Sequence, residues 1–179
     1  MRNSNYVKKL VFAAMCLALC LVLPFLTMQI PEIGSALLPM HIPVLLCGFI
    51  CGPWYGLLVG IVAPLLRHVI FGMPPLLTAI GMTFELAAYG LVCGLLYKAL
   101  PKKNSSIYIS LIAAMLIGRV IWGLAMVAIM GLTNGAFTWA AFVGGAFLNA
   151  IPGIIIQIVL IPVLVMVLDN PKVLDLGDK

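Results

Sequence analysis

Residues 76–100 read LLTAIGMTFELAAYGLVCGLLYKAL, an almost uninterrupted apolar run in which Glu85 is the one charge before Lys98. A transmembrane helix needs about 20 predominantly apolar residues, and this run supplies them. On insertion scales, a charged side chain at the centre of a bilayer costs about 2.5–3.5 kcal/mol. The stretch therefore predicts a membrane-spanning helix whose carboxylate faces a cavity or a partner rather than lipid.

The rest of the chain has a similar composition. Hydrophobic residues make up 64% of it and charged residues 8%, and the mean hydropathy is +1.24. Charged residues make up about 25% of an ordinary soluble domain, so the composition excludes that class. The 179 residues suit a single membrane domain. The net charge of +5 does not indicate nucleic-acid binding, because most of the cations flank apolar spans.

Proline, glycine and polar residues divide the chain into six predicted transmembrane helices. A break at Gly52-Pro53 separates a short second span from the third, because proline disfavours helix at and before its own position. The predicted spans cover approximately residues 9–27, 42–51, 54–70, 76–100, 107–131 and 139–168. The predicted fold class is therefore an all-α integral membrane protein with six transmembrane helices.

Lysine and arginine are distributed unevenly between the predicted loops. Six spans put both ends of the chain on one side of the membrane, and most of the 10 Lys and Arg fall on that side. They are Arg2, Lys8, Lys9, Lys98, Lys102, Lys103, Lys172 and Lys179. The opposite loops hold no Lys or Arg. The positive-inside rule then predicts a multi-pass plasma-membrane protein with both termini in the cytoplasm.

Three charged residues lie inside the predicted spans: Arg67, Glu85 and Arg119. At 1.5 Å per helical residue, Arg67 and Arg119 lie roughly 20 and 18 Å from the inner face, and Glu85 roughly 13 Å from the outer face. All three fall in the outer half of a core about 30 Å thick, and Asn149 reaches a similar level. We expect them to line a small-molecule site. Their net positive charge favours an anionic ligand, such as a carboxylate held by arginine.

Three further residues complete the predicted site. Tyr89 lies one turn after Glu85 on the same helical face, Trp122 lies three residues after Arg119, and His41 lies towards the outer rim. Pockets for small molecules combine aromatic walls with a few polar anchors. The predicted substrate-binding residues are Arg67, Glu85, Tyr89, Arg119, Trp122, Asn149 and His41.

Each of these residues also has a purely structural interpretation. Glu85 and Arg119 could form an ion pair that only joins two helices. Arg67 could extend its charge to the outer headgroups. Asn149 could bond another helix, and His41 could simply begin one. The sequence leaves these alternatives open.

Motifs for catalysis and for resident cofactors are absent from the sequence. It contains no GxxxxGK[ST], no HExxH and no GxSxG, so we predict neither an enzyme nor a cofactor. The cysteines lie in apolar runs without accompanying histidine or carboxylate, so we interpret them as packing residues rather than metal ligands. They are Cys16, Cys20, Cys47, Cys51 and Cys93. Active uptake would need a partner or an ion gradient.

Two stretches carry a resemblance to a known family. The first predicted span contains Ala14-Met15-Cys16-Leu17-Ala18, an Ala-x-x-x-Ala pattern, and residues 39–53 read PMHIPVLLCGFICGP. Together with six predicted spans and no ATPase motif, they make the chain resemble the substrate-binding S components of energy-coupling factor (ECF) vitamin transporters. The second stretch is similar to the riboflavin-type branch of that family.

The resemblance implies a function and a set of partners. It implies high-affinity capture of a vitamin-like molecule from outside and inward release when the S component topples in the membrane. The implied partners are a transmembrane coupling protein, contacted by Ala14 and Ala18, and two cytoplasmic ATPases. A net positive pocket makes pantothenate the first expected ligand, with riboflavin, cobalamin and folate open. The alternatives are a stand-alone transporter that carries protons on Glu85, and a non-transporting membrane scaffold.

Overall fold

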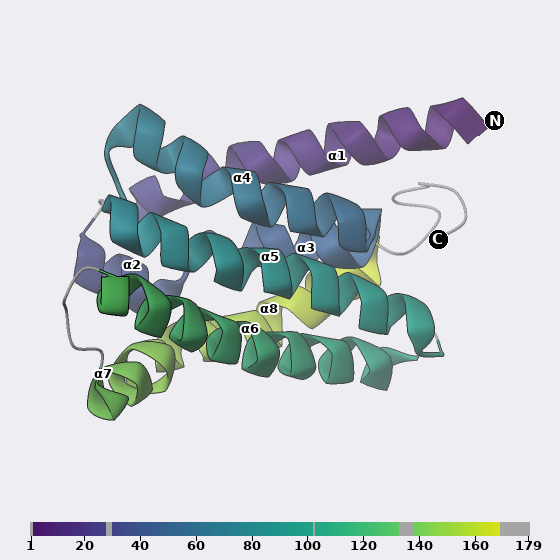
Figure 1. The fold of residues 1–179 in the computed structure, drawn as a ribbon. Helices are drawn as coiled ribbons and strands as arrows, with labels where there is room; N and C mark the ends of the chain where they lie inside the picture. Colours follow the sequence, from purple (N-terminus) through teal and green to yellow (C-terminus); the bar gives the residue numbers. More distant parts are fainter. Residues whose placement is uncertain (1, 28–29, 102, 133–137, 169–179) are drawn as a thin grey trace.

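The computed structural model of the chain describes residues 2–27, 30–101, 103–132 and 138–168, and these residues form helices joined by short connections (Figure 1). In chain order the helices are α1 (Arg2–Val22), the 3-10 helix η1 (Leu23–Thr27), α2 (Pro31–Leu37), α3 (His41–Cys51), α4 (Pro53–Phe71), α5 (Leu76–Ala99), α6 (Asn104–Leu132), α7 (Trp139–Val143), the π-helical segment η2 (Gly144–Leu148) and α8 (Ile151–Leu168). The prediction of an all-helical membrane protein is confirmed.

Within the described residues, 5 helices are long and apolar enough to cross a membrane. They include α1, α4, α5, α6 and α8. The predicted second span is α3, whose 11 residues extend about 16 Å, well short of a bilayer core. The helix α3 is therefore too short to cross the bilayer core by itself.

Two predicted segments differ from the observed elements. The region between the first two predicted spans, where the sequence predicts no span, contains the short helix α2, which begins at Pro31 because proline fits the first turn of a helix. The predicted span 139–168 is divided into α7, η2 and α8. Gly144 and Gly145 loosen the helix there, and Pro152 at the start of α8 supplies no backbone N–H.

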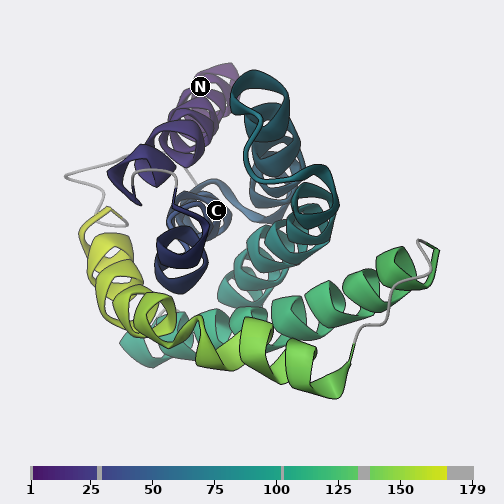
Figure 2. The ribbon, with the colours of Figure 1, turned by 90° about the vertical axis from the view of Figure 1, so that its left-hand side faces the viewer.

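The short helix α3 lies at the centre of the bundle. It packs against α1, α4, α5 and α8, while α4 packs on α5, α5 on α6, and α6 on α8. Figure 2 shows α1, α4, α5, α6 and α8 arranged around α2 and α3. All residues of α3 except Ile42 are buried. A helix that is hydrophobic on every face is expected to be enclosed on all sides, and α3 is such a helix.

Five glycines, which we call the glycine seam, bring α3, α4 and α5 into backbone contact. They are Gly48, Gly56, Gly60, Gly90 and Gly94. A Cβ atom on Gly90 would lie 2.3 Å from the carbonyl carbon of Gly56, and one on Gly60 would lie 2.4 Å from the backbone oxygen of Leu86. Only glycine fits such an approach. Small residues commonly allow this close packing between membrane helices.

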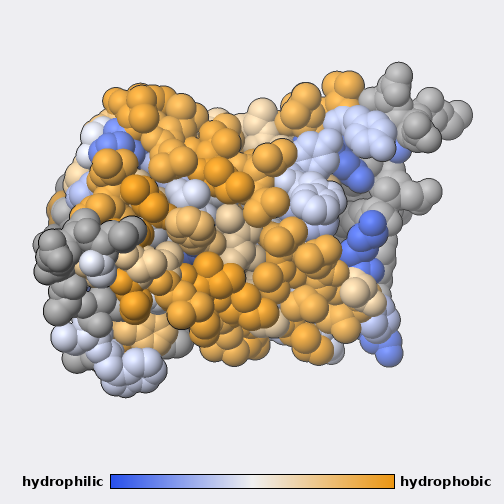
Figure 3. Space-filling model, viewed as in Figure 1, coloured by the Kyte–Doolittle hydropathy of each residue, from blue (hydrophilic) through white to orange (hydrophobic). Residues whose placement is uncertain are grey.

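The surface separates into an apolar flank and a hydrophilic end. In Figure 3, hydrophobic side chains cover most of the visible flank, and hydrophilic ones gather mainly at the end from which α1 begins. Lys98 and Lys103, at the connection between α5 and α6, are exposed at this end. Large exposed apolar surfaces mark contact with lipid or protein. The flank therefore matches the hydrocarbon core of a bilayer.

Candidate functional site

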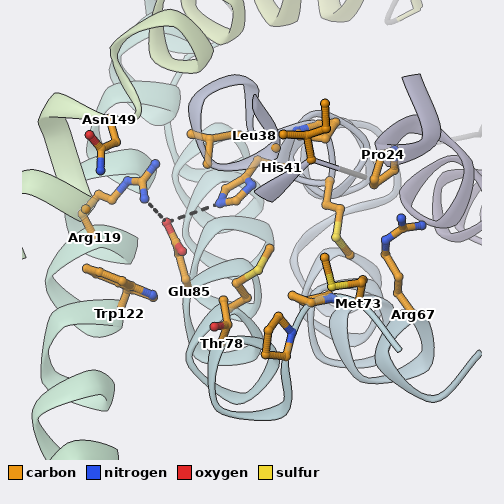
Figure 4. Close-up of a pocket in the computed structure, with 18 residues that line it drawn as sticks. Pro24, Leu38, His41, Arg67, Met73, Thr78, Glu85, Arg119, Trp122 and Asn149 are labelled. Atoms are coloured by element: carbon orange, nitrogen blue, oxygen red, sulfur yellow. Dashed lines mark ion pairs between the residues drawn. The ribbon is translucent and has the colours of Figure 1, made fainter. Parts of the chain in front are cut away.

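A cavity of about 500 Å³ lies at the opposite end of the bundle, beside α2 and the α4–α5 connection (Figure 4). Most of its wall is apolar, with the side chains of Met40, Met73 and Met82. Its polar lining residues include His41, Arg67, Glu85, Arg119 and Asn149. The size and the mixture of apolar wall and few polar groups are typical of small-molecule sites.

Three helices place a charged cluster at the inner end of the cavity. Glu85 of α5 is 2% exposed. Its Oε1 atom lies 2.9 Å from Nη1 of Arg119 on α6 and 3.3 Å from Nε2 of His41 at the start of α3. We call these three residues the buried triad. The predicted meeting of Glu85 and Arg119 is observed, and His41 joins them instead of lying at the rim.

The contacts within the buried triad leave hydrogen-bonding capacity unused. Among the described residues, Glu85 Oε1, Arg119 Nε and Nη2, and both ring nitrogens of His41 are buried without a hydrogen-bond partner. The charges are therefore close together, but their N–H groups and lone pairs are not aligned as hydrogen bonds. Buried polar groups in folded proteins are nearly always paired. The triad has the features of a site that a bound molecule completes.

Tyr89 lies behind the triad and outside the cavity lining. Its ring packs edge-on against the His41 ring at a centroid distance of 5.2 Å, and it is completely buried. A Cβ atom on Gly118 would lie 2.0 Å from the Tyr89 ring, so α6 approaches this ring closely. The structure places Tyr89 as a support for His41 rather than as a wall of the cavity.

Arg67 lies on the other side of the cavity from the buried triad (Figure 4). It is 2% exposed, and its Nη1 donates a hydrogen bond to the backbone carbonyl of Leu21. The guanidinium carbon lies 5.0 Å from the ring centroid of Phe25 and 5.2 Å from that of Phe71. Arg67 therefore holds the end of α1 and η1 against α4, and it contributes a positive charge to the cavity wall.

Trp122 and Asn149 belong to the wall formed by α6 and the π-helical segment. The Trp122 ring stacks on Phe142 of α7 with centroids 6.4 Å apart, and a Cβ atom on Gly145 would lie 2.9 Å from this indole. The backbone N–H of Asn149 donates to the carbonyl of Gly144 at 2.9 Å, across a π-helical turn. Such turns frequently occur at functional sites.

Sequence reasoning missed most of the apolar wall. Met40, Met73 and Met82 line the cavity, but methionine is an ordinary core residue and carries no positional signal in a chain with 10 of them. Pro74 and Pro75, which directly precede the predicted span 76–100, also line the cavity. The sequence signal for this part of the wall was the pair of prolines next to the predicted site. Proline fixes the backbone of a loop and has no N–H group, so such a loop can form an apolar wall.

The cysteines and the two alanines of α1 lie outside this site. All five cysteines are free and lie in the hydrophobic core. The thiol of Cys20 donates to the backbone carbonyl of Met40 at 3.5 Å, which fits their interpretation as packing residues. Ala14 and Ala18 are exposed on α1.

Comparison with known proteins identifies the family. The family model described as the ECF transporter, substrate-specific component, matches residues 8–165. No curated protein and no solved structure matches the chain. The matched region contains the whole cavity and both alanines. This is a family of transporters rather than enzymes, and membership implies capture of a vitamin-type substrate together with an energizing module. The chain belongs to the substrate-specific components of ECF transporters.

Proposed function

We propose that this protein captures a vitamin-like molecule with high affinity from the outer side of the plasma membrane and delivers it inward. The proposed binding site is the cavity beside the buried triad. One observation carries the site: Glu85, Arg119 and His41 are buried at its inner end with unused donors and acceptors. A purely structural ion pair would align these hydrogen bonds, because unmet buried polar groups destabilise a fold.

The proposed topology has six crossings with both termini in the cytoplasm. Five crossings correspond to the long helices. We infer that α2 and α3 together make the remaining one, since α2 lies beside the cavity and α3 extends from it into the bundle. The exposed Lys98 and Lys103 then lie on the cytoplasmic side, as the positive-inside rule requires. The cavity lies on the outer side, where a substrate arrives.

The charges favour an anionic ligand. Arg67 and Arg119 line the cavity against the single carboxylate of Glu85. Two N–H groups of Arg119 have no partner among the described residues, and a carboxylate oxygen is a strong acceptor for them. Pantothenate, which carries one carboxylate, is our first candidate. Membership of the riboflavin-type branch stays a prediction.

The proposed energizing partners are a transmembrane coupling protein and two cytoplasmic ATPases. Ala14 and Ala18 lie exposed on α1 at the spacing of one helical turn. Small exposed side chains allow a second helix to approach closely. We propose that this face of α1 contacts the coupling protein.

Mass spectrometry of ligand that remains bound through mild purification tests the capture function. We expect a vitamin, and we expect its addition to stripped protein to raise the unfolding temperature. The control is the double variant Glu85→Gln/Arg119→Gln, which should carry no ligand. Absence of any vitamin, with no shift across a vitamin panel, would contradict the proposal. ATPase-independent uptake into liposomes that a protonophore abolishes would instead favour the stand-alone transporter.

A further inference from the structure

Within the proposed site, the His41 imidazole has not yet been matched to any group of the ligand. His41 is 1% exposed, and its Nε2 atom lies 3.3 Å from Glu85 Oε1. This contact is not aligned as a hydrogen bond, but the nearby carboxylate favours placing the hydrogen of a neutral imidazole on Nε2, which leaves Nδ1 as the acceptor. Nδ1 is buried and has no hydrogen-bond partner among the described residues. It can pair only with a group that donates.

Arg119 contacts the same oxygen of Glu85, but it has unpaired donors and therefore lacks acceptors. Its Nη1 lies 2.9 Å from Glu85 Oε1, while its Nε and Nη2 are buried donors without partners among the described residues. The triad therefore combines unpaired donors on Arg119 with an unpaired acceptor on His41. A ligand carboxylate satisfies the donors of Arg119, but its lone pairs meet the lone pair of His41 Nδ1.

The charges around His41 lead to the same difficulty. Glu85 and Arg119 cancel each other, and a neutral His41 adds nothing. From α5, the other titratable group facing His41 is Tyr89, whose ring centroid lies 5.2 Å away. The described parts of α1 and α8 bring no charged residue to this end of the bundle. A carboxylate bound at the triad therefore gives the triad and the ligand together a net charge of −1, while the remaining guanidinium of the cavity, that of Arg67, lies on the opposite wall.

The helix α4 supplies two more titratable groups, and neither compensates that charge at the triad. Arg67 lies across the cavity, where its guanidinium contacts the Leu21 carbonyl and two aromatic rings. The Nδ1 atom of His68 lies 2.8 Å from the Pro74 carbonyl oxygen. Arg67 keeps its charge on the far wall of the cavity and His68 contacts a backbone carbonyl, so a second positive charge at the triad itself has to come from a proton.

We propose that the site takes up a carboxylic acid as its anion together with one proton, and that His41 holds the proton on Nδ1. This inference rests on the proposed capture function and specifies its ligand class. The ligand carboxylate accepts from Arg119, and the new Nδ1–H of His41 donates to the same carboxylate. The positive charges of His41 and Arg119 then balance those of Glu85 and the ligand. The proton comes from the outer solution and leaves when the anion leaves.

Proton uptake makes binding depend on pH in one direction. Because the complex holds one more proton than its separated parts, lower pH favours the complex. Where free His41 is neutral, carboxylate affinity weakens about tenfold for each unit of rising pH. A ligand without the carboxylate brings no charge and should bind with no such slope.

Isothermal titration calorimetry on the full chain tests the proposal. The probes are pantothenate and folate, which carry carboxylates, and pantothenol, in which an alcohol replaces the pantothenate carboxylate; riboflavin and cobalamin complete the set. Titrations in buffers of different ionisation enthalpy give the number of protons taken up. We expect uptake approaching one proton for a carboxylate and none for pantothenol. In His41→Gln, carboxylate binding should weaken and lose its pH slope, whereas His68→Gln should keep both proton uptake and slope.

Every other result of these titrations contradicts one specific part of the proposal. Carboxylate binding without proton uptake contradicts the proposal and leaves the capture function intact; the carboxylate would then lie at Arg67. Proton uptake that persists in His41→Gln shows that another group holds the proton. Binding of riboflavin or cobalamin alone contradicts the ligand class. Failure of every probe, with no ligand carried through purification, contradicts the proposed function itself.

Discussion

The two ends of α5 differ in how they meet the neighbouring helices. Towards its C-terminal end, Gly90 and Gly94 contact the backbones of α3 and α4 through the glycine seam. One turn before Gly90, the backbone of Leu86 still contacts Gly60. Beyond Glu85, towards the N-terminal end, Met82 and Thr78 line the cavity instead. The helices are in backbone contact along one half, and the other half of α5 lines the cavity.

This difference shows how a small bundle holds a cavity without losing stability. Close helix packing provides many dispersion contacts, which are collectively large. The seam supplies these contacts in the half near the hydrophilic end, and Glu85 lies where the seam ends and the cavity begins. The unmet polar groups of the triad can persist there because the remaining structure holds them in place. Changes in the seam should therefore affect folding, and changes in the triad should affect ligand binding.

The largest expected effect is loss of folding on Gly90→Leu. Even the first added atom would lie 2.3 Å from the backbone of Gly56, so α4 and α5 would have to separate. Overpacking of a core costs about 1–3 kcal/mol where side chains can adjust, and a backbone cannot. We expect no monodisperse protein by size-exclusion chromatography in detergent.

The matched control for the seam is Gly131→Leu on α6, where a Cβ atom would meet nothing within 4 Å. This change should leave folding intact or stabilise it by about 0.5–1 kcal/mol, since leucine favours helix over glycine. Equal tolerance of both substitutions would show that the seam does not hold α4 against α5.

A smaller but still large effect is expected from Glu85→Gln. The change leaves the Arg119 charge buried without its carboxylate, and breaking a buried pair in this way costs about 3–5 kcal/mol. The double variant Glu85→Gln/Arg119→Gln removes both charges and should regain most of that loss. Thermal unfolding of the ligand-free proteins measures both effects.

The two glutamine variants also separate the structural interpretation of the pair from the binding one. If Glu85 and Arg119 only join α5 to α6, the double variant should still retain ligand. We expect it to be stable and to carry none, because the donors that the ligand needs are gone.

The sequence reveals the members of the triad but not their geometry. Glu85 and Arg119 are conspicuous because charge is rare in apolar spans, and the two converge as their estimated depths predict. His41 was placed at the rim because short helices have no fixed depth in sequence. In the structure, α3 begins inside the bundle and brings His41 to Glu85. Depth estimates fix a level along the membrane, not the direction in which a side chain points.

Helix ends were predictable where proline and glycine mark them. The fourth predicted span, 76–100, matches α5 to one residue, because Pro74-Pro75 and Pro101 flank it. The predicted single span 139–168 is divided in the structure into α7, η2 and α8. The sequence did not reveal this division, because the apolar composition is continuous across the π-helical segment and hydropathy does not detect a change of helical winding. Residue propensities therefore predict where a helix ends, but not where it changes from α-helical to π-helical geometry.

A moderate effect confined to binding is expected from Arg119→Lys. Lysine keeps a positive charge opposite Glu85 but loses the Nε and Nη2 donors that have no partner among the described residues. Hydrogen bonds to charged groups contribute about 1.5–3 kcal/mol, so ligand affinity should fall about tenfold to a hundredfold. Calorimetry measures the affinity, and the unfolding temperature without ligand should change little. Unchanged affinity would mean that Arg119 serves Glu85 alone.

The smallest effect on the site itself is expected from Ala14→Trp. Ala14 is exposed on α1 and lies far along the helix from the residues that line the cavity, so ligand affinity should stay within about twofold of the unchanged protein, as for distant independent sites. A large indole on a face that needs small residues should instead prevent close approach of the coupling protein, and uptake by the reconstituted transporter should be lost. Ala128→Trp adds the same group at an exposed position on α6 and should preserve both binding and uptake. Equal loss of uptake in both variants would remove α1 as the coupling face, whereas loss of binding in Ala14→Trp would show that the cavity and the α1 surface are not independent.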